Sequence, residues 1–111
     1  MTEKLYDLAE RAARKGWTVI KSTEVRGDGA QAPGAVTLCG TGEEPQPLAV
    51  HFFNAQDGGF HNGDYYAAGE RAAAEARYAY QAERFTRHHA RLDARAASAA
   101  DAETAPAGPR M

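Results

Sequence analysis

The segment from Leu48 to Arg95 constrains the fold most strongly, because it combines two short strands, a glycine turn and one long helix. Residues 48–54 alternate with the period of a strand, and both faces carry apolar side chains, which is typical of an interior strand. The Asp-Gly-Gly sequence at 57–59 accepts positive φ at low cost, as a reversal between strands requires. Residues 60–66 are therefore predicted to form the return strand.

A second reversal signal, Asn62-Gly63, offers an alternative hairpin tip. That choice would force the alanine-rich run after Tyr66 into a strand, against its helix propensity. We therefore prefer the turn at 57–59, and expect Gly63 to be a bulge or a point of close approach.

The residues upstream supply the rest of a small sheet. Thr2 is predicted to cap a helix from Glu3 to Lys15, and Gly16 to end it. Strands are expected at 17–25 and 35–40, with the intervening loops rich in glycine, proline and charged residues.

The long helix is expected to begin near Glu70 and to pack its first half on the sheet, because Tyr78, Phe85 and Leu92 recur every seven residues. Ala96 to Met111 is predicted to be a flexible tail, so the single domain is placed at 1–95. The fold class is α+β. The expected architecture has two layers, with an N-terminal helix, an antiparallel four-stranded meander sheet and a long C-terminal helix, and both helices on one face.

Composition narrows the classes of function. Hydrophobic residues make up 43% of the chain, but 25 of them are alanine, which predicts a thin core and favours pairing with a partner or a second copy. The net charge of −2 argues against a dedicated nucleic-acid binder, and leaves the C-terminal helix as the cationic surface. Without a secretory or membrane-spanning segment, the expected location is cytoplasmic.

Arginines on the long helix are the first candidate site. Arg77, Arg84 and Arg91 recur every seven residues, and Arg87 lies near the same line. Arginine donates two parallel hydrogen bonds to phosphates or carboxylates, so this edge is a candidate partner-binding surface. The alternative is a solvated helix face on which Glu83 and Arg87 form an ion pair.

Aromatic side chains on the last strand are the second candidate. Phe60, Tyr65 and Tyr66 could form a stacking platform or a hydrophobic hot spot for a partner, and core packing is the alternative. Because Tyr65 and Tyr66 are adjacent in a strand, they are expected to point to opposite faces.

Neither a metal, a cofactor nor a catalytic group is expected. His51 and His61 lie on paired strands, but His88 and His89 are adjacent on a helix and point about 100° apart, so they do not serve one ion easily. The solitary Cys39 excludes an internal disulfide and is expected to be a small buried hydrophobe.

The run from Phe53 to Phe60, continuing through Gly63 and Tyr65 into an alanine-rich helix, resembles short uncharacterised proteins of bacterial plasmids and phages. This likeness covers about residues 48–87. It implies a compact accessory protein of a mobile element that works by binding, and no activity attaches to that group.

The expected function is therefore a small non-enzymatic protein-interaction module, with homodimerisation left open. In a mobile element, the partner would be host machinery, including a defence complex that the protein inhibits. The alternative is a nucleic-acid-binding accessory protein that uses the arginine edge, and a metal-dependent or nucleotide-modifying enzyme has the least support.

Overall fold

The structure is a computed structural model that describes residues 5–28 and 31–104 of the 111-residue chain. The elements are, in chain order, α1 (Leu8–Arg14), β1 (Thr18–Val25), β2 (Gly34–Gly40), β3 (Leu48–Asn54), β4 (Gly59–Tyr66), the 3-10 helix η1 (Ala68–Glu70) and α2 (Arg71–Thr104). The predicted α+β class, the element order and the four-stranded meander are confirmed, since the strands pair antiparallel in the order β1-β2-β3-β4.

The hairpin of β3 and β4 turns where the sequence predicted. Gly58 has a φ of 73°, and the backbone N–H of Gly59 donates to Asp57 Oδ1 over 2.7 Å. Further along β4 the register shifts, because residues 62 and 63 together oppose His51. A Cβ on Gly63 would lie 2.3 Å from His51 Nε2, so only glycine fits there. Both predicted roles of Gly63, bulge and close approach, are confirmed.

The main core lies between the sheet and the first half of α2. Leu38 and Val50 from the central strands pack against Ala74 and Tyr78 of the helix, and Phe85 covers the border of this core. The Tyr78 hydroxyl also hydrogen-bonds Thr23 Oγ1 on β1. The predicted packing of the first half of the long helix is thus confirmed, and it follows from the helical spacing of its apolar residues.

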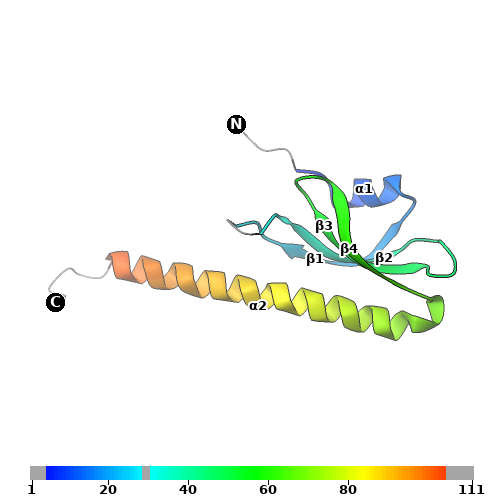
Figure 1. Ribbon diagram of the computed structural model, residues 1–111. Helices are drawn as coiled ribbons and strands as arrows, with labels where there is room; N and C mark the ends of the chain where they lie inside the picture. Colours follow the sequence, from blue (N-terminus) through cyan, green and yellow to red (C-terminus); the bar gives the residue numbers. More distant parts are fainter. Residues whose placement is uncertain (1–4, 29–30, 105–111) are drawn as a thin grey trace.

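The two helices lie on opposite faces of the sheet, which corrects the expectation that both share one face (Figure 1). The backbone N–H of Tyr6, just before α1, donates to Ala55 O over 2.7 Å, and Phe53 is 1% exposed on the face that α1 covers. The physical reason is the strand period: β3 is apolar on both sides, so each side needs a cover.

Helix α1 begins later than predicted. It starts at Leu8, with Asp7 as its N-cap and Asp7 Oδ1 accepting a hydrogen bond from Glu10 N over 3.0 Å, whereas the sequence favoured Thr2, which lies outside the described residues. Its predicted end is confirmed: Gly16 has a φ of 77°, and the N–H of Trp17 donates to Ala12 O.

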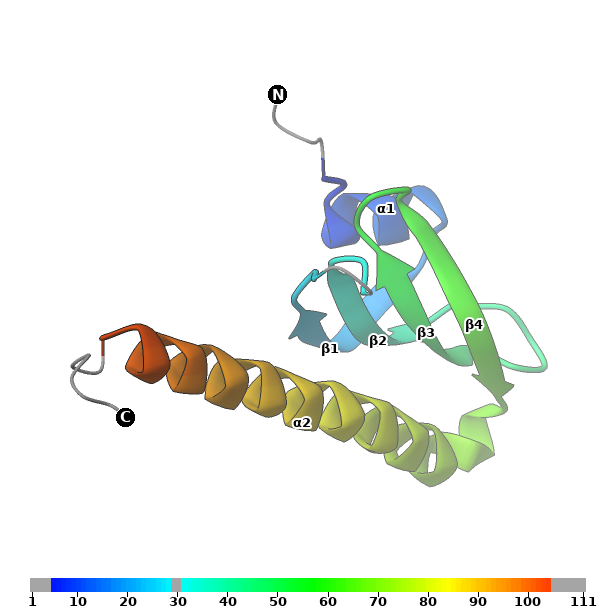
Figure 2. The same ribbon diagram turned by 60° about the vertical axis from the view of Figure 1, so that its left-hand side comes forward.

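Helix α2 continues to Thr104, past the Arg95 boundary at which the sequence ended the domain. Residues 96–104 are therefore helical rather than part of a tail, and the rest of the predicted tail, 105–111, lies outside the described residues. Figure 2 shows that the C-terminal half of α2, drawn in orange and red, extends beyond the sheet. Alanine is the best helix former, so alanine-rich sequence can stay helical without a core beside it.

Candidate functional site

A groove runs between α2 and the neighbouring face of β3 and β4. Its first part has a volume of about 430 Å³ and is lined by Phe52 and Asp64 on the sheet and by Arg77 and Arg84 on α2. A second hollow of about 290 Å³ lies beside Arg84, Phe85, His88 and Arg91. We call the two together the arginine groove; its arginines are Arg77, Arg84 and Arg91, and Phe52 and Phe85 are its stacked apolar rings, 5.9 Å apart.

The four predicted arginines differ in their pairing. Arg77 Nε donates to Asp64 Oδ2 over 3.1 Å, and Arg87 forms an ion pair with Glu83. Among the described residues, neither Arg84 nor Arg91 has a carboxylate within ion-pair distance. The positive charge that remains unpaired at the groove is thus concentrated on these two residues.

Tyr80 is a further residue of this edge that the sequence analysis did not select. Tyr80 is 54% exposed, and its ring lies between two guanidinium groups, 5.5 Å from Arg77 Cζ and 5.9 Å from Arg84 Cζ. Such cation–π contacts hold an arginine in place while leaving its donors available. The signal was present in the sequence, because Tyr80 lies three residues after Arg77 and four before Arg84, the spacings that meet on a helix.

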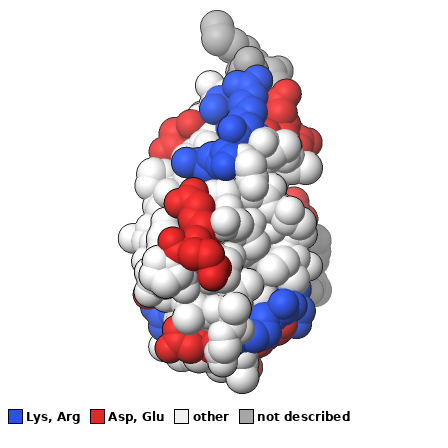
Figure 3. All heavy atoms as spheres, turned by 90° about the vertical axis from the view of Figure 1, so that its right-hand side faces the viewer, with Lys and Arg blue, Asp and Glu red and all other residues white. Residues whose placement is uncertain are grey.

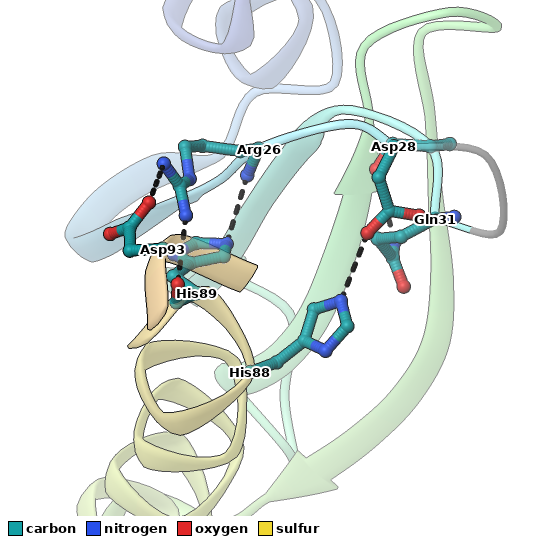
Figure 4. Close-up of polar contacts among 7 residues, drawn as sticks. Arg26, Asp28, Gln31, His88, His89 and Asp93 are labelled. Carbon is teal, nitrogen blue, oxygen red and sulfur yellow. Dashed lines mark hydrogen bonds and ion pairs between the residues drawn. The ribbon is translucent and has the colours of Figure 1, made fainter. Parts of the chain in front are cut away.

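Arg26 and Asp28, which follow β1, contact two histidines of α2 (Figure 4), and one of these, His88, lines the second hollow of the groove. His88 Nε2 lies 2.9 Å from Asp28 Oδ2, and Asp28 Oδ1 accepts a hydrogen bond from Gln31 N over 2.8 Å. Gln31 in turn lines both hollows of the groove. This chain of contacts therefore connects Asp28 and Gln31 to α2.

The neighbouring histidine faces a different partner. His89 Nε2 accepts a hydrogen bond from the backbone N–H of Arg26 over 3.1 Å, and the Arg26 guanidinium binds Asp93 Oδ1 and His89 O. His88 and His89 point apart, as their adjacency on a helix predicted. Together with the contacts of Asp28, these bonds hold α2 to the sheet beyond its last core residues.

The three predicted aromatic residues do not form one platform. Tyr66 packs against the core under α2, whereas Tyr65, 43% exposed, and Phe60 lie on the opposite face. There the rings of Trp17 and Phe60 are 5.1 Å apart, and the Tyr65 ring lies 5.3 Å from that of His51. The expectation that Tyr65 and Tyr66 point to opposite faces is confirmed.

His51 is the buried centre of this aromatic cluster. It is 4% exposed, its ring stacks on Trp17 at 5.2 Å, and its Nε2 lies 3.0 Å from the Tyr65 hydroxyl. Burial, followed by the nearby charge of Lys15, lowers the pKa of His51. His61 does not approach His51 as a ligand pair; it binds Asp57 instead, at 3.0 Å.

We expect this burial to make the stability of the domain depend on pH. Because the pKa of His51 is lower in the folded than in the unfolded chain, the unfolded chain gains a proton first as the pH falls. The contribution of neutral His51 to the free energy of unfolding is complete above the ordinary histidine pKa of about 6.5. It is lost as the pH falls below that value, and the free energy of unfolding then decreases by at most about 1.4 kcal/mol per pH unit. Urea unfolding at pH 7.5 and 5.5 should show a steeper loss in the wild type than in His51→Gln. Equal losses in the two proteins would contradict this, since the other histidines are present in both.

Cys39 is a buried free thiol. Burial raises the pKa of the Cys39 thiol, which keeps it protonated and unreactive. In the part of the chain that the structure describes, no group of three or more histidine, cysteine or acidic side chains is arranged to hold a metal ion. The arginine groove and the aromatic cluster are thus the surfaces with the clearest binding chemistry.

Comparison of the chain with protein families, curated proteins and solved structures found no match. The resemblance to plasmid and phage accessory proteins therefore stays a prediction. Within residues 5–28 and 31–104, no helix is both long and apolar enough to cross a membrane.

Proposed function

We propose that this protein is a non-enzymatic protein-interaction module whose arginine groove binds an acidic segment of a partner protein. The observation that carries the proposal is the pair Arg84 and Arg91, which lack carboxylate partners among the described residues and flank the hollow beside Phe85. Unpaired guanidinium groups beside an apolar ring suit a peptide that alternates carboxylates with apolar side chains.

The surroundings of these two arginines support a peptide ligand. Guanidinium groups seven residues apart on a helix lie about 10 Å apart along its axis, which is close to the span of three residues of extended peptide. The stacked rings of Phe52 and Phe85 give an apolar contact between them, and Gln31 and Gln81 line the same groove with amide donors and acceptors.

Charge distribution favours a protein over a nucleic acid. Arg77 and Arg87 are already paired inside the molecule, and the carboxylates of Asp64 and Glu83 lie along the same edge. Nucleic-acid affinity grows with the number of phosphates that are neutralised, and the two arginines of the groove without an ion pair, in a chain of net charge −2, neutralise few. Two arginines, Arg84 and Arg91, are enough to pair with the carboxylates of a short acidic segment of protein.

The test is a fluorescence anisotropy titration with a labelled peptide in which glutamate alternates with leucine. We expect the double variant Arg84→Ala/Arg91→Ala to bind this peptide at least about tenfold more weakly than the wild type, because two charge-assisted contacts are lost. A control with the same net charge is Arg14→Ala/Arg71→Ala, whose arginines form exposed ion pairs away from the groove. This control should bind like the wild type.

Two results would overturn the proposal. The first is equal affinity of the Arg84→Ala/Arg91→Ala variant and the wild type for the acidic peptide. The second is preferential binding of a single-stranded DNA oligonucleotide with a steep loss of affinity in raised salt, which would establish the nucleic-acid alternative instead. Far-UV circular dichroism of each variant confirms that the fold is retained.

A further inference from the structure

On the sheet face opposite α2, the loop between β2 and β3 borders a separate hollow of about 300 Å³. Two aromatic rings, Trp17 and Tyr65, and the carboxyl-bearing Glu43 and Glu44 line it, together with polar residues such as Gln46. We call this hollow the aromatic slot. Its residues come from three parts of the chain that are distant in sequence.

The rings of the aromatic slot are held from behind by His51. Trp17 stacks on His51 at 5.2 Å, with an angle of 19° between the rings, and the edge of Phe60 lies against Trp17. The Tyr65 hydroxyl lies 3.0 Å from His51 Nε2, while 43% of Tyr65 remains exposed. Because these rings are fixed before any ligand arrives, little side-chain entropy is lost on binding.

The acidic side of the slot is also ordered by hydrogen bonds. The backbone N–H of Thr41 donates to Pro47 O over 2.8 Å and closes the loop, and Thr41 Oγ1 accepts a hydrogen bond from Glu43 N over 3.2 Å. Gly42 has a φ of 73°, which permits the tight turn between them. The loop therefore holds its glutamates at the border of the slot.

The charge of this region is not neutralised within the described chain. Glu43 and Glu44 are exposed, and neither has a lysine or arginine within ion-pair distance among the described residues. Figure 3 views the molecule from the side on which this loop lies, and it shows acidic side chains grouped at the middle of that face, with basic side chains above them. A cation is thus the complementary ligand.

A cation from the same chain already contacts one ring of the slot. Lys15 Nζ lies 5.0 Å from the centroid of the Trp17 ring. Lys15 therefore lies over the Trp17 face that His51 leaves open, where a positive charge is stabilised by the ring quadrupole, and an incoming cation would take its place. This intramolecular contact identifies the chemistry that the slot offers to a partner.

We infer that the aromatic slot is a second recognition site, which binds the guanidinium group of an arginine side chain presented by a basic peptide. A guanidinium stacks flat on an aromatic ring and at the same time donates two parallel hydrogen bonds to a carboxylate, so it uses both halves of the slot. An ammonium group lacks the planar stacking, and a quaternary ammonium lacks the donors. This site lies on the other face of the sheet from the arginine groove and does not depend on it.

The single tryptophan of the chain gives a direct measurement, because Trp17 lines the slot itself. We expect titration with a short glycine-flanked arginine peptide to change the tryptophan fluorescence in a saturable way. The matched peptide with citrulline, which keeps the planar shape without the charge, should cause no saturable change. The lysine peptide should bind more weakly than the arginine peptide.

The variant Glu43→Gln/Glu44→Gln should weaken binding of the arginine peptide about fivefold, since it removes both carboxylates and leaves the rings in place. Glu10→Gln/Glu83→Gln is the control for net charge, because both of its carboxylates are exposed and lie elsewhere. The variant Arg84→Ala/Arg91→Ala should also bind the arginine peptide like the wild type. Equal binding of the citrulline or lysine peptide, or an equal loss in either control, would overturn the inference.

Discussion

Replacing Phe53 with alanine is expected to lower the free energy of unfolding by about 3–5 kcal/mol. Phe53 is 1% exposed and lies on the sheet face that α1 covers, next to the ring of Phe60 at 5.2 Å. Truncation removes a fully buried ring and leaves a cavity on the face that α1 covers. For a domain of this size the loss is a large part of the total stability.

Urea unfolding followed by far-UV circular dichroism measures this loss. The control is Phe60→Ala, which removes a ring of the same size from the same cluster at a half-buried position. Phe60→Ala should lower the free energy of unfolding clearly less than Phe53→Ala does, because part of the Phe60 ring is already in contact with water. A cost for Phe53→Ala no greater than for Phe60→Ala would show that the face under α1 is not a packed core.

The hairpin is the part of the fold that could be predicted best from the sequence, because its signals are local. The turn at 57–59 and the bulge at Gly63 follow from glycine chemistry and from the alternation of residues in two neighbouring strands. The core face of α2 up to Phe85 follows in the same way from helical spacing. In each case, residues close in sequence determine the outcome.

The parts that could not be predicted depend on contacts between distant segments. The position of α1 rests on the bond of Tyr6 to Ala55, which has no sequence pattern, although the apolar residues on both faces of β3 indicated that each face needs a cover. The part of α2 that follows its core residues is attached by the contact between His88 and Asp28, which are sixty residues apart in the chain. The ion pair of Arg77 with Asp64 joins two different elements and was not predicted, whereas the local pair of Glu83 with Arg87 was the stated alternative and is confirmed.

The aromatic slot escaped the sequence analysis for the same reason. Trp17 directly precedes β1 and Tyr65 lies on β4, which are the two edge strands of the sheet, and the buried His51 contacts both rings. The sequence analysis selected Tyr65 with Phe60 and Tyr66 as aromatic residues of the last strand, and it did not select Trp17. The pattern that would have helped is the combination of Gly63 with His51, since a glycine opposite a histidine leaves room for the ring.

Replacing Gly34 with alanine should cost at least about 3 kcal/mol, at the upper end of what overpacking causes. A Cβ on Gly34 would lie 1.8 Å from the carbonyl oxygen of Phe53, far inside van der Waals contact. A side chain can move away by rotation, but a backbone oxygen of a paired strand cannot move without disturbing that strand. Gly34 is also paired with Asn54 and begins β2, so the strain falls at the end of β3 that leads into the hairpin turn.

The matched control for this substitution is Gly69→Ala in η1. A Cβ there meets nothing within 4 Å, and the residue has no positive φ, so the change should be neutral or stabilise the domain by up to about 1 kcal/mol through the unfolded state. Urea unfolding of both variants measures the difference between them. If Gly34→Ala were as stable as Gly69→Ala, the close approach of β2 to β3 at this point would be wrong, and with it the register that positions Phe53 under α1.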